Sequence, residues 1–233
     1  MELTELNLNE VANLDNFSGL VPLFPLSSVV FFPNTLLPLH IFEPRYRDMV
    51  NTSLESEKII GMALLKPGWE SDYYSNPDVY DVIGMGRIVS SERFEDGKIN
   101  IVLYGLKRAR IVEIVKDLPY RLARVSLLDN IYNPSDEALR GELEGLINKW
   151  NLYLDDKQKS HRININTKLP LENLTDALAS LIFPNVFDKQ KLLEETDVQR
   201  RAQFILKDLK SRLEMISITS KRRDEIVNKR NLN

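Results

Sequence analysis

The stretch VPLFPLSSVVFFPNTLLPLHIFEPRYRDMV, residues 21–50, decides the fold of this chain. Five prolines interrupt a strongly apolar run before it becomes charged. The four prolines before Pro44 each lack a backbone N–H and fix φ, so the run can be neither a helix nor a central strand. We expect short extended pieces at the edges and corners of a barrel-like β lobe, then a helix from Pro44, since proline suits the first helical turn.

The composition is that of an ordinary globular protein. The 233 residues are 43% hydrophobic and 28% charged, with a net charge of −3. The chain has no cysteine, which excludes disulfides and thiolate metal sites and favours a cytoplasmic location. Prolines break the apolar run before the roughly 20 residues of a membrane span, so we expect no membrane partner.

The pattern along the chain predicts three parts. Residues 1–20 are acidic and Asn-rich, and we interpret them as a loose leader. Residues 21–133 have the alternation and turn residues of strands. From Asn133-Pro134 onward apolar residues recur every three or four positions, which predicts a helical lobe over 134–233, ending in a long basic helix.

Within the β-rich part, strands are expected over 59–68, 86–94, 108–117 and 120–128. Asp96-Gly97 provides a positive-φ pair for a tight hairpin. In the helical part, apolar stripes predict helices through Leu143 and Leu178, and Thr196 with Gln199 forms a capping box for the last helix.

Motifs for catalysis or cofactor binding are missing. The chain contains no P-loop, no G-x-S-x-G elbow and no histidine metal motif, so we expect neither enzymatic activity nor a cofactor. His40 is interpreted as a half-buried hydrogen-bonding residue and His161 as a loop residue. Gly84 and Gly86 lack the third glycine of a dinucleotide site, and we expect them to let a strand bend or another backbone approach.

An aromatic loop is the first candidate binding site. The segment KPGWESDYYSNPDVYDVIG, residues 66–84, carries Trp69, Tyr73, Tyr74 and Tyr80 between two strands. Large amphipathic rings on a loop are typical anchors for a protein or peptide partner. The alternative is that Trp69 and Tyr80 fold back and cover the β lobe.

A charged cluster around EPRYR is the second candidate. Glu43 and Arg45 flank a proline, and Arg47 follows. The three charges are candidates for a polar recognition point. The alternative is that they cap the helix start and pair within the fold.

The chain resembles the Lon N-terminal domain family, the LON substrate-binding domain. The resemblance is carried by residues 21–50, GMALLKPGWESDYY (61–74), GRIV with the DGK hairpin (96–98), LYGLKRARI (103–111), YRLARV (120–125), LTDALASLI (174–182) and KQKLLEETDVQRRAQFIL (189–206). Asn34 replaces the glycine that commonly follows FP in the family. Asn also tolerates positive φ, so we expect the turn to be retained.

The resemblance implies an α+β fold in which a PUA-like, mostly antiparallel β barrel precedes a helical bundle. It also implies a stand-alone LON-domain protein, because the ATPase and Ser-Lys peptidase domains of a complete Lon protease do not follow. The implied role is non-catalytic binding of exposed polypeptide segments or of a protein quality-control partner. The oligomeric state stays open.

Two other functions remain as alternatives. The first is RNA binding through the PUA-like barrel and the basic last helix, which carries Lys221, Arg222 and Arg223, although the acidic overall pI of about 5.6 argues against a nucleic-acid partner. The second is an unrecognised hydrolase, as the family's peptidase label suggests.

Overall fold

The computed structural model describes residues 7–71, 77–132, 136–154 and 162–230, with the side chains of the last helix described as far as Ser217. Its contacts divide the chain into two compact units. The β unit comprises Met1–Asp129 and Phe183–Thr196, and the helical unit comprises Asn130–Ile182 and Asp197–Asn233. The expected boundary near Asn133 therefore needs one change, because residues 183–196 return to the β unit.

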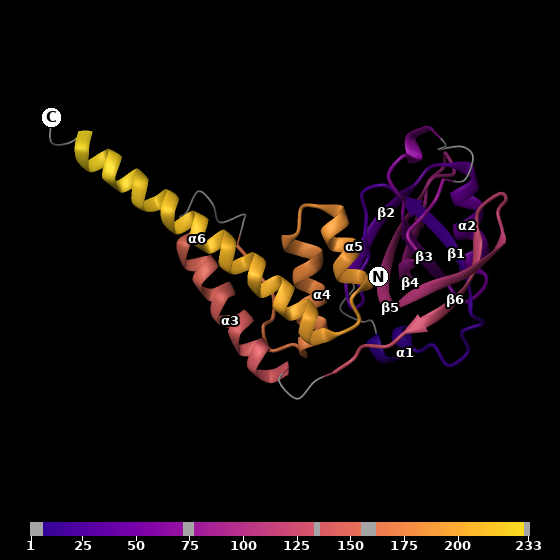
Figure 1. The fold of residues 1–233 in the computed structure, drawn as a ribbon. Helices are drawn as coiled ribbons and strands as arrows, with labels where there is room; N and C mark the ends of the chain where they lie inside the picture. The colour runs from indigo at the N-terminus through magenta and orange to yellow at the C-terminus, as the bar shows by residue number, and fades with distance from the viewer. Residues whose placement is uncertain (1–6, 72–76, 133–135, 155–161, 231–233) are drawn as a thin grey trace. The chain divides into compact units, whose positions relative to one another are not determined.

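The β unit contains a six-stranded, mostly antiparallel sheet (Figure 1). Its strands are β1 (Leu20–Leu26), β2 (Leu36–Ile41), β3 (Ile59–Leu64), β4 (Val82–Arg93), β5 (Ile99–Lys116) and β6 (Leu122–Leu128). The order across the sheet is β2-β5-β4-β3-β1-β6, and β5 also pairs with β6. Only the β1–β3 pair is parallel among these described strands. The strand expected over 108–117 is the second half of one long strand, β5, which begins at Ile99.

The sequence had suggested that the prolines of β1 lie at a sheet edge, but they do not. β1 has neighbours on both sides, but Leu20–Pro22 pair with β6 while Leu23–Leu26 pair with β3. Each half of β1 thus pairs with a neighbour on one side in this register. A proline, which lacks the backbone N–H, therefore destabilises the sheet less there than in a strand paired on both sides. Pro38 follows the expectation, since it lies in β2, which pairs only with β5 among the described strands.

The turn after β1 packs its backbone directly onto two glycines. A Cβ on Gly84 would stand 1.9 Å from the carbonyl oxygen of Phe31, and one on Gly105 would stand 2.1 Å from that of Phe32. Asn34 takes a φ of 56° and donates from its backbone N–H to the Gly105 carbonyl at 2.8 Å. Both the close approach at Gly84 and the positive φ at Asn34 confirm the sequence predictions.

The hairpin at Asp96-Gly97 is confirmed, but the turn is longer than a two-residue one. The Phe94 N–H donates to the Lys98 carbonyl, and the Gly97 N–H donates to the Phe94 carbonyl. Gly97 has a φ of 80°, whereas Asp96 is not in the positive-φ region. A single glycine therefore reverses the chain between β4 and β5.

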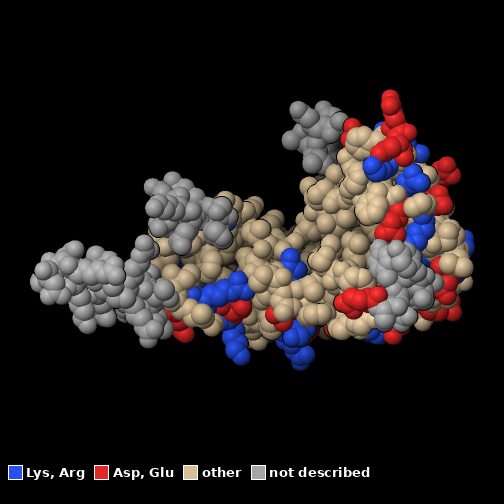
Figure 2. Space-filling model, turned by 90° about the horizontal axis from the view of Figure 1, so that it is seen from above, with Lys and Arg blue, Asp and Glu red and all other residues tan. Residues whose placement is uncertain are grey.

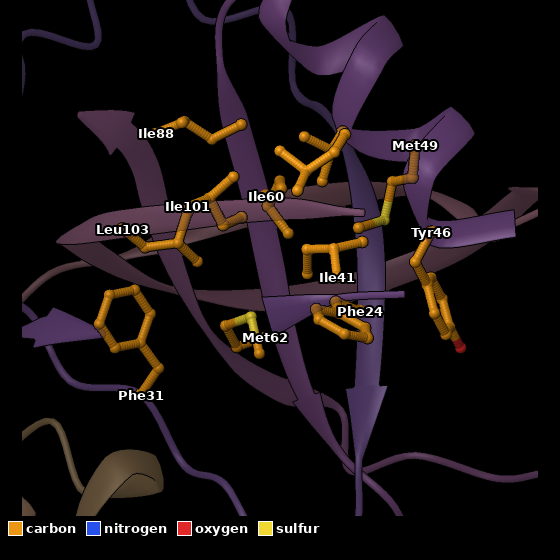
Figure 3. Close-up of a cluster of buried hydrophobic side chains, with 12 residues drawn as sticks. Phe24, Phe31, Ile41, Tyr46, Met49, Ile60, Met62, Ile88, Ile101 and Leu103 are labelled. Atoms are coloured by element: carbon orange, nitrogen blue, oxygen red, sulfur yellow. The ribbon is translucent and has the colours of Figure 1, made fainter. Parts of the chain in front are cut away.

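A cluster of buried apolar side chains fills one side of the sheet beneath α2 (Pro44–Leu54). Figure 3 shows side chains from β1, β2, β3 and β5 converging with those of α2. The cluster consists of Phe24, Phe31, Ile41, Tyr46, Met49, Val50, Ile60, Met62, Ile88, Ile99, Ile101 and Leu103. It fixes the positions of β2 and of the start of α2, which matter for the site below.

Residues 7–13 are held by a β-unit arginine. Arg87 of β4 donates to the carbonyl oxygens of Val11 at 2.6 Å and Asn13 at 2.8 Å, next to α1 (Leu8–Ala12). This part of the expected loose leader is therefore attached, and the attachment uses its backbone, which composition does not reveal.

Helix α5 (Val186–Glu194) belongs to the β unit, although it had been assigned to the helical lobe. The buried Gln190 donates to the Val82 carbonyl at 2.9 Å, and the buried Arg108 donates to the Leu193 carbonyl at 2.9 Å. In Figure 1, α5 lies beside the strands to which these bonds connect it. Two long-range hydrogen bonds to backbone thus place this helix.

The helical unit consists of α3 (Asp136–Tyr153), α4 (Leu171–Ile182) and α6 (Val198–Arg230), with α6 running along α3 and past α4 (Figure 1). The apolar stripe of α6 is buried from Val198 to Leu213. The predicted cap is different: Asp197 Oδ1, not Thr196, accepts from the Arg200 backbone N–H at 3.1 Å. Among the described residues no helix is long and apolar enough to cross a membrane.

Candidate polypeptide-binding surfaces of the β unit

The outward side of the edge strand β2 is apolar and exposed. Strand alternation turns Leu37, Leu39 and Ile41 toward the core, so their neighbours point outward. We name this surface the outer β2 face and define it by Leu36, Pro38, His40, Phe42 and Phe94. All five residues are exposed, and four of them are apolar.

Aromatic rings gather at one end of this face. The His40 ring centroid lies 6.3 Å from that of Phe42 and 6.4 Å from that of Phe94, which follows β4. Phe42 is 60% exposed and Phe94 is 41% exposed. His40 Nδ1 lies 2.8 Å from Asn100 Oδ1 on the neighbouring strand, and this hydrogen bond orients the imidazole. The predicted hydrogen-bonding role of His40 is confirmed, but the residue is exposed.

The aromatic loop is closed at its base by a β-bridge between Leu65 and Val79. Trp69 begins a short 3₁₀ turn, and both Trp69 and Tyr80 are half-buried. This burial lies between the two alternatives from the sequence, a free anchor and a ring folded back on the sheet. Tyr73 and Tyr74 lie outside the described residues.

The EPRYR charges lie at the start of α2. Arg45 Nε donates to Glu43 Oε2 at 3.2 Å, and the Arg45 guanidinium lies 4.6 Å from the Tyr46 ring centroid. Arg47 Nη1 donates to the Asp96 carbonyl at 3.4 Å. These contacts favour pairing within the fold for Glu43, while Arg45 also borders a pocket.

That pocket lies where five segments of the β unit meet. Its lining residues are Leu23 and Pro25 from β1, Arg45 and Tyr46 from α2, Leu65 after β3, Pro77 from the base of the aromatic loop, and Pro119, Tyr120 and Arg121 from the β5–β6 connection. We name it the Arg121 pocket. Burial lowers the pKa of Arg121, which is 6% exposed. The structure thus brings Arg45 together with the foot of the aromatic loop, but Trp69 and Tyr80 do not line this pocket.

Sequence reasoning missed the exposed rings of the outer β2 face and the buried Arg121. Leu36, Pro38, His40 and Phe42 recur at every second position, so the outer β2 face had a signal in the sequence. Arg121 had no such signal in the sequence, because its pocket includes residues from segments about 40 and 75 residues away in the chain.

The described residues were also considered as metal ligands and as a basic surface for nucleic acid. Within the described part of the chain, no group of three or more His, Asp or Glu side chains is placed to hold a metal ion. Figure 2 shows acidic and basic side chains interspersed over the visible face of the β unit, without a large basic area. The side chains of the basic segment 221–230 lie outside the described residues.

The sequence matches the ATP-dependent protease La (LON) substrate-binding domain over residues 20–211, and the chain belongs to this family. The fold agrees with that assignment. The N-terminal domain of the Mycobacterium avium complex Lon protease is similar with a TM-score of 0.62 at 17% identity, covering 82% of this chain and 98% of that one. A Lon N-terminal domain protein from Xanthomonas campestris has a TM-score of 0.56 at 26% identity, covering 80% of this chain and 96% of that one.

Curated relatives are whole Lon proteases. The Lon protease of Dictyoglomus thermophilum is 28% identical over 231 residues, which are 98% of this chain and 28% of the relative. Lon protease 2 of Myxococcus xanthus is 27% identical over 212 residues, covering 90% of this chain and 26% of the relative. The chain thus spans little more than a quarter of the length of these relatives, and the matched part is their non-catalytic substrate-binding domain.

Proposed function

We propose that this chain is a non-catalytic binding module for exposed apolar segments of polypeptides, working in the cytoplasm in protein quality control. Membership of a substrate-binding domain family supports the class of ligand. The observation that carries the proposal is the outer β2 face, where Phe42 and Phe94 are 60% and 41% exposed. Exposed apolar clusters on a folded domain mark interaction sites.

The energetics suit a transient receptor. An aromatic anchor that fills a pocket in a partner contributes about 2 kcal/mol, and micromolar affinity needs about −8 kcal/mol. Phe42 and Phe94 together with the rings of the aromatic loop would supply much of that amount after ordering costs. Because an unfolded segment is extended, it can lie along an edge strand and contact every second side chain of β2.

The binding proposal is tested with one polypeptide in two states. A fluorescently labelled protein is titrated with this chain, once in its native form and once reduced and carboxymethylated so that it stays unfolded. Fluorescence anisotropy is expected to give micromolar binding of the unfolded form and at least tenfold weaker binding of the native form. Equal affinities for the two forms, or no binding of either, would contradict the proposal.

The aromatic loop is proposed as a second contact. Replacement of Trp69, Tyr73 and Tyr74 by alanine is expected to weaken binding of the unfolded polypeptide about tenfold, as the loss of one well-used anchor does. Unchanged binding by this triple variant would remove the loop from the site and leave the outer β2 face alone. Tyr80 and Glu43, which are half-buried, are expected to contribute less.

The proposal also includes the absence of catalysis by this chain. Incubation with casein, with and without ATP, is expected to leave the casein intact. Its degradation by the purified chain would overturn this part of the proposal and restore the hydrolase alternative. On the face shown in Figure 2, acidic and basic side chains of the β unit are interspersed, and this arrangement does not favour RNA as a second ligand there.

A further inference from the structure

The Arg121 pocket contains a buried positive charge with few hydrogen bonds. Within the described part of the chain, the Arg121 guanidinium donates one hydrogen bond, from Nη2 to the Pro77 carbonyl at 2.7 Å. A guanidinium has five N–H donors, so this contact uses a minor part of its capacity. Arg121 is nevertheless 6% exposed, and a buried charge is expensive unless it is paired.

The acidic side chains nearby do not supply the pair. Asp117 Oδ1 lies 4.0 Å from Arg121 Nε, beyond hydrogen-bonding distance, and the Asp117 side chain is 62% exposed to solvent. Burial lowers the pKa of Arg121 most, and the charges of Asp117, Tyr46 and Asp78 only partly oppose that effect. Arg45 is the second cation that lines the pocket, and its charge also lowers the pKa of Arg121.

The walls limit what can enter. Tyr46 and Tyr120 provide rings, and Pro77 and Pro119 provide walls without N–H donors. The enclosed space is about 20 Å³, which is enough for about one water molecule or one oxygen-bearing end of a small group. One oxygen of a carboxylate fits a space of this size, and guanidinium N–H groups are strong donors to carboxylate oxygens.

We propose that the Arg121 pocket binds a carboxylate group of the polypeptide that the β unit takes up, with Arg121 and Arg45 as its ligands. The carboxylate belongs either to the carboxyl terminus of the polypeptide or to an Asp or Glu side chain. The inference rests on the proposed function, since a polypeptide must be bound for its carboxylate to be presented. The pocket then adds a polar requirement to an otherwise apolar preference.

The proposal is tested with three labelled hexapeptides of the same apolar sequence. The first has a free carboxyl terminus, the second is amidated, and the third is amidated and carries an internal Glu. Anisotropy titrations with the wild-type chain are expected to show at least tenfold tighter binding of the free acid than of the plain amide. Tight binding of the Glu peptide as well assigns the pocket to any carboxylate, whereas weak binding of that peptide assigns it to the terminus.

Variants locate the effect. Arg121→Lys keeps the charge but loses the fork, and Arg45→Gln removes the second cation, so each is expected to reduce the preference for the acid to about twofold. Arg110→Gln changes an exposed arginine of β5 outside the pocket and is expected to retain the full preference. The comparison of acid and amide on the wild-type chain needs no variant, so it remains decisive if Arg121→Lys does not fold.

The failure of this inference is distinguishable from that of the proposed function. If the acid and the amide bind with equal, measurable affinity, the carboxylate site is wrong and polypeptide binding stands. If the preference for the acid persists in both Arg121→Lys and Arg45→Gln, the carboxylate is bound elsewhere and the inference fails. If none of the peptides binds and the unfolded polypeptide does not bind either, both proposals fail together.

Discussion

Single glycines set how closely two backbones approach in the β unit. Gly84 and Gly105 lie under the carbonyl groups of Phe31 and Phe32, and Asn34 completes the turn with a positive φ. The sequence predicted that Gly84 lets another backbone approach or a strand bend, because the third glycine of a dinucleotide-binding motif is missing there. It did not predict the partner, since a glycine in a strand indicates a close approach without naming the segment that approaches.

Replacement of Gly84 by alanine is expected to destabilise the β unit. The new Cβ would stand 1.9 Å from the Phe31 carbonyl oxygen, and a backbone atom can move only with its whole segment. We expect Gly84→Ala to lower the free energy of unfolding by at least about 2 kcal/mol, measured by urea titration with Trp69 fluorescence.

Gly145→Ala is the matched control for that substitution. Gly145 lies in α3, and a Cβ added there would have no neighbouring atom within 4 Å outside its own helix backbone. This change is expected to stabilise the helix by up to about 1 kcal/mol, because alanine has the higher helix propensity. If Gly84→Ala changed stability by less than about 0.5 kcal/mol, the contact between the turn and β4 would be refuted.

Helix α5 shows what periodicity misses at the level of elements. Its sequence lies between two predicted helices, and its nine residues gave no stripe of their own. It is placed by the buried Gln190 and Arg108, which donate to backbone carbonyls more than 80 residues away in sequence. Stripes predicted α3, α4 and α6 well, because there the burial itself repeats along the helix.

Replacement of Gln190 by leucine is expected to loosen α5. The Val82 carbonyl would lose its side-chain donor while staying buried, which costs about 1–3 kcal/mol. Hydrogen exchange of the α5 amides should become faster by a corresponding factor of at least about five. Lys191→Ala, at the exposed neighbouring position, should leave these rates unchanged, and equal rates in both variants would contradict the anchoring role of Gln190.

The helical unit depends on a buried ion pair between α4 and α6. Arg201 Nε lies 3.6 Å from Asp176 Oδ1, and the two side chains are 0% and 2% exposed. Asp176→Ala would leave the arginine charge buried, and we expect a loss of about 3–5 kcal/mol. The urea transition of this unit can be followed by Trp150 fluorescence in a Trp69→Phe background.

Glu142→Ala is the control for the ion pair. Glu142 pairs with Lys210 on the surface of the same unit, where a single pair contributes less than about 1 kcal/mol. Similar losses from Asp176→Ala and Glu142→Ala would mean that the buried pair does not stabilise the helical unit as described.

At the scale of the whole molecule, the sequence predicted the order of a β-rich part and a helical part. It did not predict that residues 183–196 return to the β unit, because a change of pattern along the chain can mark only contiguous parts. The candidate site divides in the same way. The outer β2 face had a period-two signal, while the Arg121 pocket is assembled from five segments of the chain and becomes visible only in the folded structure.

The most direct measurement is the affinity of the chain for an unfolded polypeptide when the outer β2 face is changed. The double variant Phe42→Ala/Phe94→Ala removes the two exposed rings, and Leu152→Ala removes an exposed apolar side chain from α3 as a control. The account predicts at least tenfold weaker binding by the double variant and unchanged binding by Leu152→Ala. Wild-type affinity in the double variant would contradict the claim that this face binds polypeptides.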